Sequence, residues 1–346
     1  MINPPPFQGR RVLSYCVAAQ ELQDIENLYA GKYGAGIRQG SGRTYNKCIP
    51  MQEGENMEYV LLNNGVSMPM LGFGTFQIPA GEPCRQAVAA AISAGYRHID
   101  TASSYQNEDA VGQAIRQSGV ARSELFITSK AYIHEMGYEQ TKAAFDRQLR
   151  LLGLDYLDLY LVHMPFGDYY GSWRAMEELY KEGKIRAIGV SNFSSSRLMD
   201  LCYNADIAPA VNQIERHPFY QRAEELAVMQ ELGVQAEAWA PFAEGMNGMF
   251  TQSVLQEIAA AHGKSVAQVI LRWEIQCGLP CIVKSIRPER IQENFAIWDF
   301  ELTSDEMKRI AALDLGHPQM LDTERPSEVK RVYDFLNNPV VTSLHE

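Results

Sequence analysis

The sequence GYRHIDTASSYQNE, residues 95 to 108, decides how the rest of the chain is interpreted. Its apolar pair His98-Ile99 is typical of a short buried strand that ends at Asp100, and Tyr105 follows five residues later. Glycine at position 95 is typical of the residue that ends a preceding helix. A carboxylate at a strand end close to a phenol is suited to acid–base chemistry. The stretch therefore predicts a helix, then a strand, then two polar side chains beyond it.

The same alternation of a short apolar strand and an amphipathic helix recurs along the chain. We expect strands at 71–75, 98–102, 125–130, 157–163, 185–192, 209–215, 235–242 and 280–286. Helices are expected between them, among others at 85–93, 138–152, 173–182, 223–232 and 253–261. Each strand is almost continuously apolar, as in parallel sheets that are buried on both faces. Eight strand–helix units predict a (β/α)8 TIM barrel, which is an α/β fold.

Other segments complete this barrel. Asn64-Gly65 lies between two apolar runs and predicts an N-terminal β-hairpin. The Gly- and Met-rich segment 241–252 predicts a loop over the barrel mouth. The polar, Pro-broken tail that starts at Gly316 is expected to cross the mouth. Two more helices are expected, at 289–297 and 305–313.

Residues 1–56 differ in composition from the rest of the chain. They contain three consecutive prolines and a Gly-rich run at 31–43. We interpret them as a flexible N-terminal extension, or as upstream sequence that follows an early start codon. Residues 57–346 are then the barrel domain.

Charge and composition exclude several classes of function. The 346 residues carry a net charge of −11, which argues against binding to nucleic acid or to an anionic membrane surface. The six cysteines form no CxxC pair, so we expect neither a metal site nor a disulfide scaffold. No apolar run reaches the roughly 18 residues that span a bilayer. We expect a monomeric cytoplasmic protein with no membrane partner.

The carboxyl ends of the expected strands carry polar or aromatic side chains. In barrels of this type these ends form the active face. They are Thr75, Asp100, Lys130, His163, Ser191-Asn192, Gln213, Trp239 and Lys284-Ser285. The number of reactive groups favours an enzyme over a purely structural barrel.

Four residues at or just beyond these strand ends suggest a catalytic group: Asp100, Tyr105, Lys130 and His163. Taken singly, each has a structural explanation, such as an ion pair, a wall residue or a buried histidine. Together, they would place a phenol beside an ammonium ion, which lowers a phenol's pKa. We expect Asp100 to keep Lys130 charged and His163 to orient a substrate oxygen. Because none of these groups transfers electrons, a cofactor is required.

A second set of residues favours a nicotinamide dinucleotide. Ser191, Asn192 and Gln213 offer groups that can hold a carboxamide, and Trp239 offers a face for stacking. Beyond the last strand, cations and a hydroxyl surround an expected helix N-terminus and favour a phosphate; they are Lys284, Ser285, Arg287 and Arg290. A Rossmann unit is not supported, because Gly72 and Gly74 are not followed by a third glycine.

These motifs resemble the aldo-keto reductase family. GYRHIDTASSYQNE is similar to the first signature of this family. The sequence from Leu161 to Asn192 is similar to its second conserved region, and IVKSIRPERIQEN is similar to its third. The similarity covers roughly residues 57–315 and leans toward bacterial 2,5-diketo-gluconate and glyoxal reductases. It implies NADPH-dependent reduction of small aldehydes or ketones.

The resemblance also implies a role for each matching residue. Tyr105 would be the general acid, with Lys130 and Asp100 lowering its pKa and His163 orienting the carbonyl. The implied NADPH-binding residues are Thr75, Ser191, Asn192, Gln213, Trp239, Lys284, Ser285, Arg290, Glu293 and Asn294. Phe76, Tyr132 and Met164 would line the substrate pocket, and the last two depart from many relatives. A non-catalytic NADPH-binding partner protein and a phosphate-binding isomerase are the alternatives.

Overall fold

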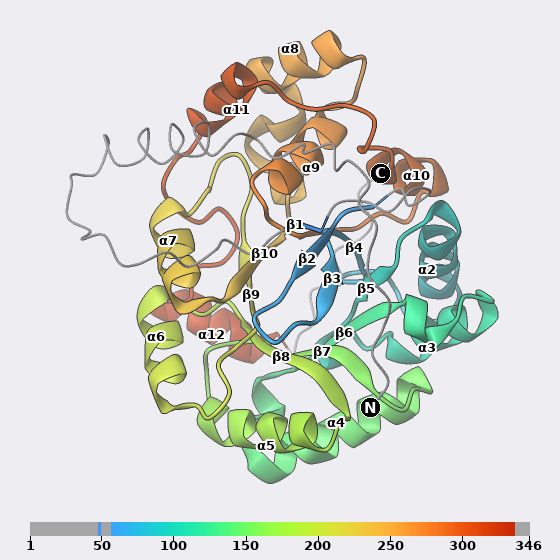
Figure 1. The fold of residues 1–346 in the computed structure, drawn as a ribbon, viewed down its shortest axis with the longest axis vertical. Coiled ribbons are helices and arrows are strands. Elements are labelled where there is room, and N and C mark those ends of the chain that lie inside the picture. The colour runs from blue at the N-terminus through green and yellow to red at the C-terminus, as the bar shows by residue number, and fades with distance from the viewer. Residues whose placement is uncertain (1–47, 50–56, 336–346) are drawn as a thin grey trace, which may run out of the picture. The chain divides into compact units, whose positions relative to one another are not determined.

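Eight parallel strands form a closed barrel. A computed structural model describes residues 48–49 and 57–335. The barrel strands are β4 (Leu71–Gly74), β5 (His98–Asp100), β6 (Phe126–Ala131), β7 (Leu157–Val162), β8 (Ile185–Ser191), β9 (Val211–Glu215), β10 (Gln235–Trp239) and β11 (Cys281–Val283). Their order around the barrel follows the chain, and β11 pairs with β4 to close it (Figure 1). The predicted (β/α)8 barrel is confirmed.

Helices surround the strands on the outside (Figure 1). They are α2 (Glu82–Ala94), α3 (Glu108–Gln117), α4 (Tyr138–Leu152), α5 (Tyr169–Lys181), α6 (Ser195–Asn204), α7 (Ala223–Leu232), α8 (Ser253–His262), α9 (Val266–Gln276), α10 (Pro288–Phe295) and α11 (Ser304–Ala311). A further helix, α12 (Pro326–Asp334), lies in the tail. The described residues also contain the short 3-10 turns η1 (Ser103–Tyr105), η2 (Arg122–Glu124) and η3 (Ile133–Glu135). In η4 (Ala243–Thr251), which lies in the segment expected to be a loop, residues 244–248 have a non-helical backbone. The helices expected at 138–152 and 223–232 have the bounds of α4 and α7.

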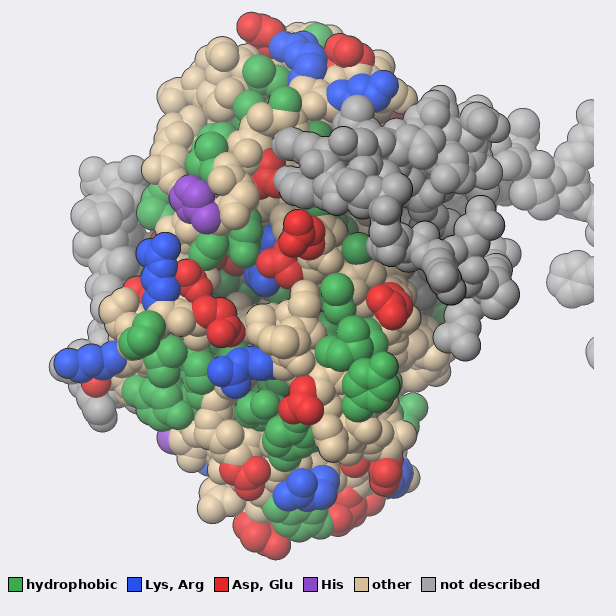
Figure 2. Space-filling view, turned by 90° about the vertical axis from the view of Figure 1, so that its left-hand side faces the viewer, with side chains coloured by type: hydrophobic (Ala, Val, Ile, Leu, Met, Phe, Trp, Pro, Cys, Tyr) green, Lys and Arg blue, Asp and Glu red, His purple; other side chains and the backbone are tan. Residues whose placement is uncertain are grey.

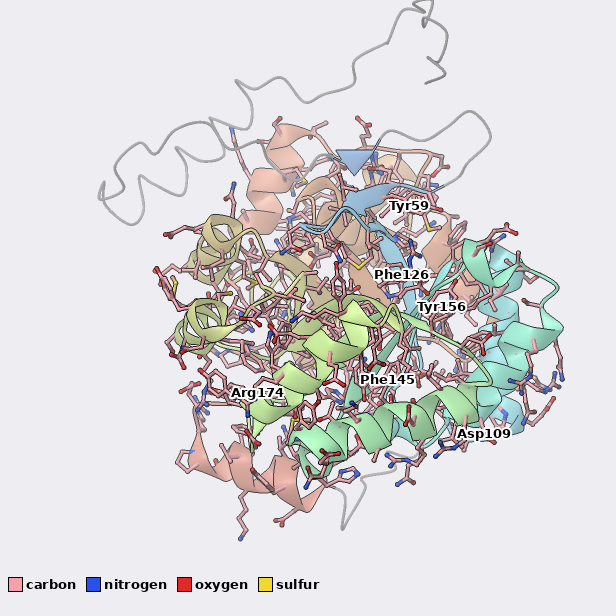
Figure 3. All side chains as sticks on the ribbon, turned by 60° about the horizontal axis from the view of Figure 1, so that its bottom comes forward. Tyr59, Asp109, Phe126, Phe145, Tyr156 and Arg174 are labelled. Carbon is pink, nitrogen blue, oxygen red and sulfur yellow. The ribbon has the colours of Figure 1, made fainter. Side chains whose placement is uncertain are left out.

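The apolar side chains of strands and helices meet between the two layers. Phe145 of α4 points toward the strands, where its ring centroid lies 5.1 Å from that of Tyr160 on β7 (Figure 3). Asp109 of α3 lies on the outer rim in the same view and is exposed. Helix α4 ends at Gly153, whose φ of 66° is the left-handed conformation that glycine favours. Burial of one stripe of each helix thus explains why the pattern predicted the barrel.

The predicted hairpin closes the amino end of the barrel. Its strands are β2 (Tyr59–Leu61) and β3 (Ser67–Pro69), which pair antiparallel. Asn63 and Asn64 of its turn donate side-chain hydrogen bonds to Pro209 O and Arg186 O, each at 2.9 Å. Both acceptors lie at the start of barrel strands, which fixes the end that the hairpin covers.

A third strand, β1 (Cys48–Ile49), pairs with β2. It belongs to the segment that we assigned to the N-terminal extension. The rest of that extension lies outside the described residues, and the division of the chain at residue 57 remains a prediction.

The tail crosses the opposite end, as expected, and contains helix α12. Pro326 begins this helix, a position that suits proline because its missing N–H would have no helical partner. The Glu215 carboxylate, at the end of β9, accepts hydrogen bonds from the backbone N–H groups of residues 319, 320 and 321 at 2.7, 3.1 and 3.0 Å. Tyr132, just beyond β6, donates a hydrogen bond to Val332 O at 2.9 Å. These contacts fix the tail on the carboxyl ends of the strands.

On the face that Figure 2 shows, acidic and basic side chains are interspersed and the basic ones form no continuous patch. Among the described residues, no helix is long and apolar enough to cross a membrane.

Candidate active site

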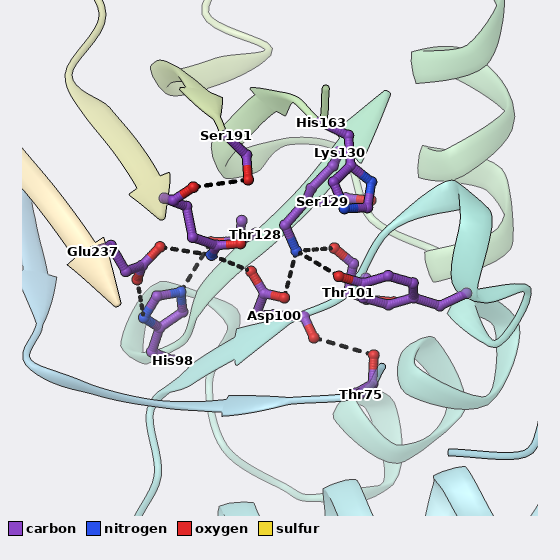
Figure 4. A network of polar contacts seen from close by, with 12 residues as sticks. Thr75, His98, Asp100, Thr101, Thr128, Ser129, Lys130, His163, Ser191 and Glu237 are labelled. Carbon is purple, nitrogen blue, oxygen red and sulfur yellow. Dashed lines mark hydrogen bonds and ion pairs between the residues drawn. The ribbon is translucent and has the colours of Figure 1, made fainter. Parts of the chain in front are cut away.

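The expected polar side chains converge at the carboxyl end of the barrel. Asp100 ends β5, Lys130 lies near the end of β6, and His163 follows β7 directly. Tyr105 lies in η1, the short helical turn after β5. The parallel register of β5, β6 and β7 brings residues from distant parts of the sequence together. Figure 4 shows this network.

Lys130 is the centre of the group. Its Nζ donates to Asp100 Oδ1 at 2.5 Å, to Thr101 O at 3.0 Å and to the Tyr105 hydroxyl at 3.3 Å. The lysine side chain is fully buried. Burial by itself lowers the Lys130 pKa, but Asp100 and Tyr105 outweigh it, and the pKa is raised. Lys130 is therefore an ammonium ion that has one carboxylate and one phenol as partners.

Tyr105 differs from expectation in its acidity. Burial is the largest cause and raises the pKa of its phenol to about 12, whereas Lys130 lowers it and Asp100 raises it further. The expected net lowering is therefore wrong, although Lys130 acts in the predicted direction. A phenol with this pKa is protonated at neutral pH, which is the state that a proton donor needs.

His163 faces the same space as an uncharged imidazole. Burial and the positive charge of Lys130 hold its pKa well below the usual value. Its ring lies edge-on to the rings of Tyr105 and Tyr132, with centroids 5.7 and 5.3 Å away. Because a neutral imidazole carries one N–H, His163 can donate one hydrogen bond to a substrate oxygen.

The sequence did not single out Asn107, which supports the Tyr105 turn. Its side-chain amide donates to Thr75 O at 2.9 Å and Ile78 O at 3.0 Å. Its oxygen accepts from the hydroxyls of Thr101 at 3.1 Å and Thr75 at 3.4 Å. Asn107 thus connects the ends of β4 and β5, and it is fully buried. In the sequence, only its position two residues after Tyr105 points to this supporting role.

The predicted pocket residues form an aromatic and apolar wall. Phe76 packs against Tyr105 with ring centroids 5.1 Å apart. Tyr132 and Met164 are buried and belong to a cluster with residues of α12 and with Phe335. The sequence did not indicate that α12 and Phe335 contribute to this wall.

The expected carboxamide-binding residues are already bonded to one another. Asn192 accepts from Trp239 Nε1 at 2.9 Å and donates to His163 O at 3.1 Å. Ser191 donates to Gln213 O at 2.9 Å. The bond to Asn192 fixes the half-buried Trp239 indole beside the network. Thr75 lies close by, buried, with its hydroxyl 3.1 Å from Asp100 O.

A basic group surrounds the N-terminus of α10. Lys284, Arg287 and Arg290 are exposed, and among the described residues none of them forms an ion pair. The Ser285 hydroxyl accepts a hydrogen bond from Arg287 N at 3.1 Å. Cations at a helix N-terminus suit a phosphate group. Of the two remaining predicted residues, Glu293 is exposed and Asn294 is buried on the same helix.

The sequence was compared with protein families and with known proteins, and the matches agree with the geometry of this site. Residues 70–315 match the aldo/keto reductase family. The chain belongs to this family. Glyoxal reductase of Bacillus subtilis (strain 168) is 52% identical over 256 residues, which are 74% of this chain and 92% of that protein. Methylglyoxal reductase DkgA of Salmonella typhimurium is 42% identical over 264 residues, or 75% of this chain and 95% of that protein.

Solved aldo-keto reductases share the fold. The enzyme of Bombyx mori in complex with NADP has a TM-score of 0.73 and 35% sequence identity, and the match covers 83% of this chain and 98% of that chain. The resemblance to bacterial aldo-keto reductases of the glyoxal and diketo-gluconate type is thereby confirmed.

Proposed function

We propose that the protein reduces small aldehydes or ketones to alcohols with NADPH. The observation that carries this proposal is the protonated Tyr105 phenol beside the buried, charged Lys130 and the neutral His163. This group lies next to an apolar wall, which suits a small uncharged carbonyl compound. Relatives named glyoxal reductase and methylglyoxal reductase support glyoxals as the first substrates to test.

The residues of the chain account for the proton half of the reaction. His163 donates a hydrogen bond that orients the carbonyl oxygen toward Tyr105. Tyr105 gives its proton to this oxygen as negative charge develops there, and Lys130 stabilises the phenolate that results. Bound NADPH supplies the hydride that the carbonyl carbon receives. Solvent then returns a proton to Tyr105.

The residues beside the acid fit a nicotinamide dinucleotide. Trp239 offers a stacking face, while Ser191, Asn192 and Gln213 bring hydroxyl and amide groups to its edge. The unpaired cations at the start of α10 fit the 2′-phosphate that distinguishes NADPH from NADH. We assign Lys284, Ser285 and Arg290 to this phosphate, with Glu293 and Asn294 near the adenine and Thr75 near the ribose.

The decisive experiment compares Tyr105→Phe with the wild type. NADPH oxidation is followed by absorbance with glyoxals, sugar-derived ketones and aromatic aldehydes. Loss of the acid is expected to lower turnover about 10²- to 10⁴-fold while NADPH still binds. Tyr203→Phe is a matched control, since Tyr203 is 82% exposed. Unchanged turnover in Tyr105→Phe would exclude the assignment of the acid.

The monomeric state and the cytoplasmic location remain predictions. Light scattering of the purified protein tests the first, and cell fractionation tests the second.

A further inference from the structure

A second carboxyl group lies beneath the candidate catalytic residues. Glu237 of β10 points into the barrel interior and is fully buried (Figure 4). Its Oε2 accepts a hydrogen bond from Gln213 Nε2 at 2.7 Å. Neither the proton transfer nor the expected cofactor contacts use this residue. An acid in such a position requires an explanation, because burial of an uncompensated charge is costly.

Gln213 is held between two carboxyl groups. Its amide nitrogen donates one hydrogen to Glu237 Oε2 and the other to Asp100 Oδ2, which lies 2.9 Å away. The reverse orientation would point the amide oxygen at both acids. Both amide hydrogens are therefore used within the protein, and the Gln213 oxygen is the atom that can accept a hydrogen bond from a carboxamide.

The other oxygen of Glu237 faces His98. Glu237 Oε1 lies 3.7 Å from His98 Nδ1, and neither atom has a hydrogen-bond partner among the described residues. His98 Nε2 lies 2.9 Å from the Thr128 hydroxyl. Burial, and then Lys130, lower the His98 pKa to about 3, so the imidazole is neutral. A proton on Glu237 Oε1 would lie on the side of the carboxyl group that faces His98.

The surrounding charges favour the protonated acid. Asp100 and Lys130 already neutralise each other. Cys281 of β11 is a buried thiol, and because burial raises its pKa it carries no charge. An ionised Glu237 would place a second negative charge on the same amide as Asp100, without a cation of its own. Burial, and then the Asp100 charge, raise the Glu237 pKa to about 8.

We propose that Glu237 is a positioning residue: its protonated carboxyl group and Asp100 together clamp the Gln213 amide. The clamp points the Gln213 oxygen toward the place of the nicotinamide carboxamide. It also holds Asp100 with its other oxygen on Lys130. The part of this inference that concerns the nicotinamide rests on the proposed function, whereas the protonation of Glu237 does not.

Infrared spectroscopy of the ligand-free protein tests the protonation. The difference spectrum between wild type and Glu237→Gln at pH 7 is expected to contain the carbonyl stretch of a protonated carboxylic acid. This band should disappear as the pH rises from 7 to 9. A difference spectrum that shows only a carboxylate at pH 7 overturns the inference, whatever the protein does with NADPH.

NADPH binding tests the clamp. In Glu237→Gln an amide oxygen still accepts from Gln213 and an amide N–H faces His98 Nδ1, so the Kd should stay within about threefold. Glu237→Leu leaves a Gln213 N–H unpaired, and the Kd should rise about tenfold, which corresponds to the usual cost of such a loss. Equal Kd values for the Leu and Gln variants would contradict the clamp.

Glu108→Gln is the matched control. Glu108 is also buried, and burial, the largest cause, raises its pKa to about 7, but its partner is Ser129. This variant should remove a different infrared band and leave the NADPH Kd unchanged. If wild type does not bind NADPH at all, the proposed function fails, and the infrared result still decides the state of Glu237. If Glu237→Leu does not fold, the infrared comparison is unaffected.

Discussion

The Lys130 ammonium group lies 3.3 Å from the Tyr105 hydroxyl, and the Lys130 side chain is fully buried. Burial and proximity act in opposite directions on the phenol. Burial keeps the proton on Tyr105 before reaction, and the ammonium group favours its departure during reaction. Tyr105 is therefore protonated before the reaction, and the phenolate that forms during proton transfer is stabilised by Lys130.

The first prediction concerns this pair. Lys130→Met should reduce turnover about 10²-fold, because the phenolate loses its cation. In the Tyr105→Phe background the same change should reduce turnover little further, since no phenolate forms. Single-turnover NADPH oxidation by the four proteins of this cycle measures the coupling. Fully additive losses would show that Lys130 acts independently of Tyr105.

The second prediction concerns Asn107. Asn107→Ala removes three buried hydrogen bonds and a weaker 3.4 Å contact with the Thr75 hydroxyl, and it should reduce the free energy of unfolding by about 2–4 kcal/mol. Displacement of the Tyr105 turn should also lower kcat more than it raises the KM for NADPH. Urea unfolding and steady-state kinetics measure the two effects. Asn63→Ala is the control: it removes one bond at the opposite end of the barrel and should leave kcat unchanged.

The third prediction concerns the tail. Glu215→Ala removes the acceptor of three backbone N–H groups and should loosen the tail, including α12, over the pocket. We expect the KM for an aldehyde to rise about tenfold, in line with the usual cost of unpaired buried donors, while the Kd for NADPH changes little. Glu224→Ala, an exposed acid on α7, is the control. An unchanged KM would show that the tail does not shape the pocket.

The fourth prediction concerns acid stability. His98 has a depressed pKa in the folded protein, so the unfolded chain binds its proton more readily. This contribution to stability is present above pH 6.5 and is lost as the pH falls toward about 3. Between pH 7 and pH 5 the loss should be about 2 kcal/mol from this residue. The raised pKa of Glu237 acts in the opposite direction over the same range. Chemical unfolding of wild type and of His98→Gln at both pH values therefore measures the His98 contribution as the difference between the two proteins.

Sequence alone predicted the barrel and the convergence of the four polar residues. The strand-end rule suffices for both, because Asp100, Lys130 and His163 lie at or just beyond the carboxyl ends of successive strands and Tyr105 lies in the turn that follows the first of them. Asn107, Glu237 and Glu215 were missed because their roles depend on partners that the local pattern does not indicate. Glu215, for example, bonds to backbone groups more than 100 residues away.

The sign of the Tyr105 shift was wrong for a related reason. Sequence shows which charges are neighbours, and Lys130 was identified in this way. It does not show how deeply a group is buried, and burial is the larger effect on this phenol.

The attachment of the tail to Glu215 also determines when the site is completed during synthesis. Residues 319–335 leave the ribosome after all eight strands, so a nascent chain can assemble the polar strand ends before it has α12 to cover them. The wall beside Tyr132 is then the last part of the site to form. A barrel without residues 319–335 should already have the catalytic residues in place, and it should accept bulkier carbonyl compounds.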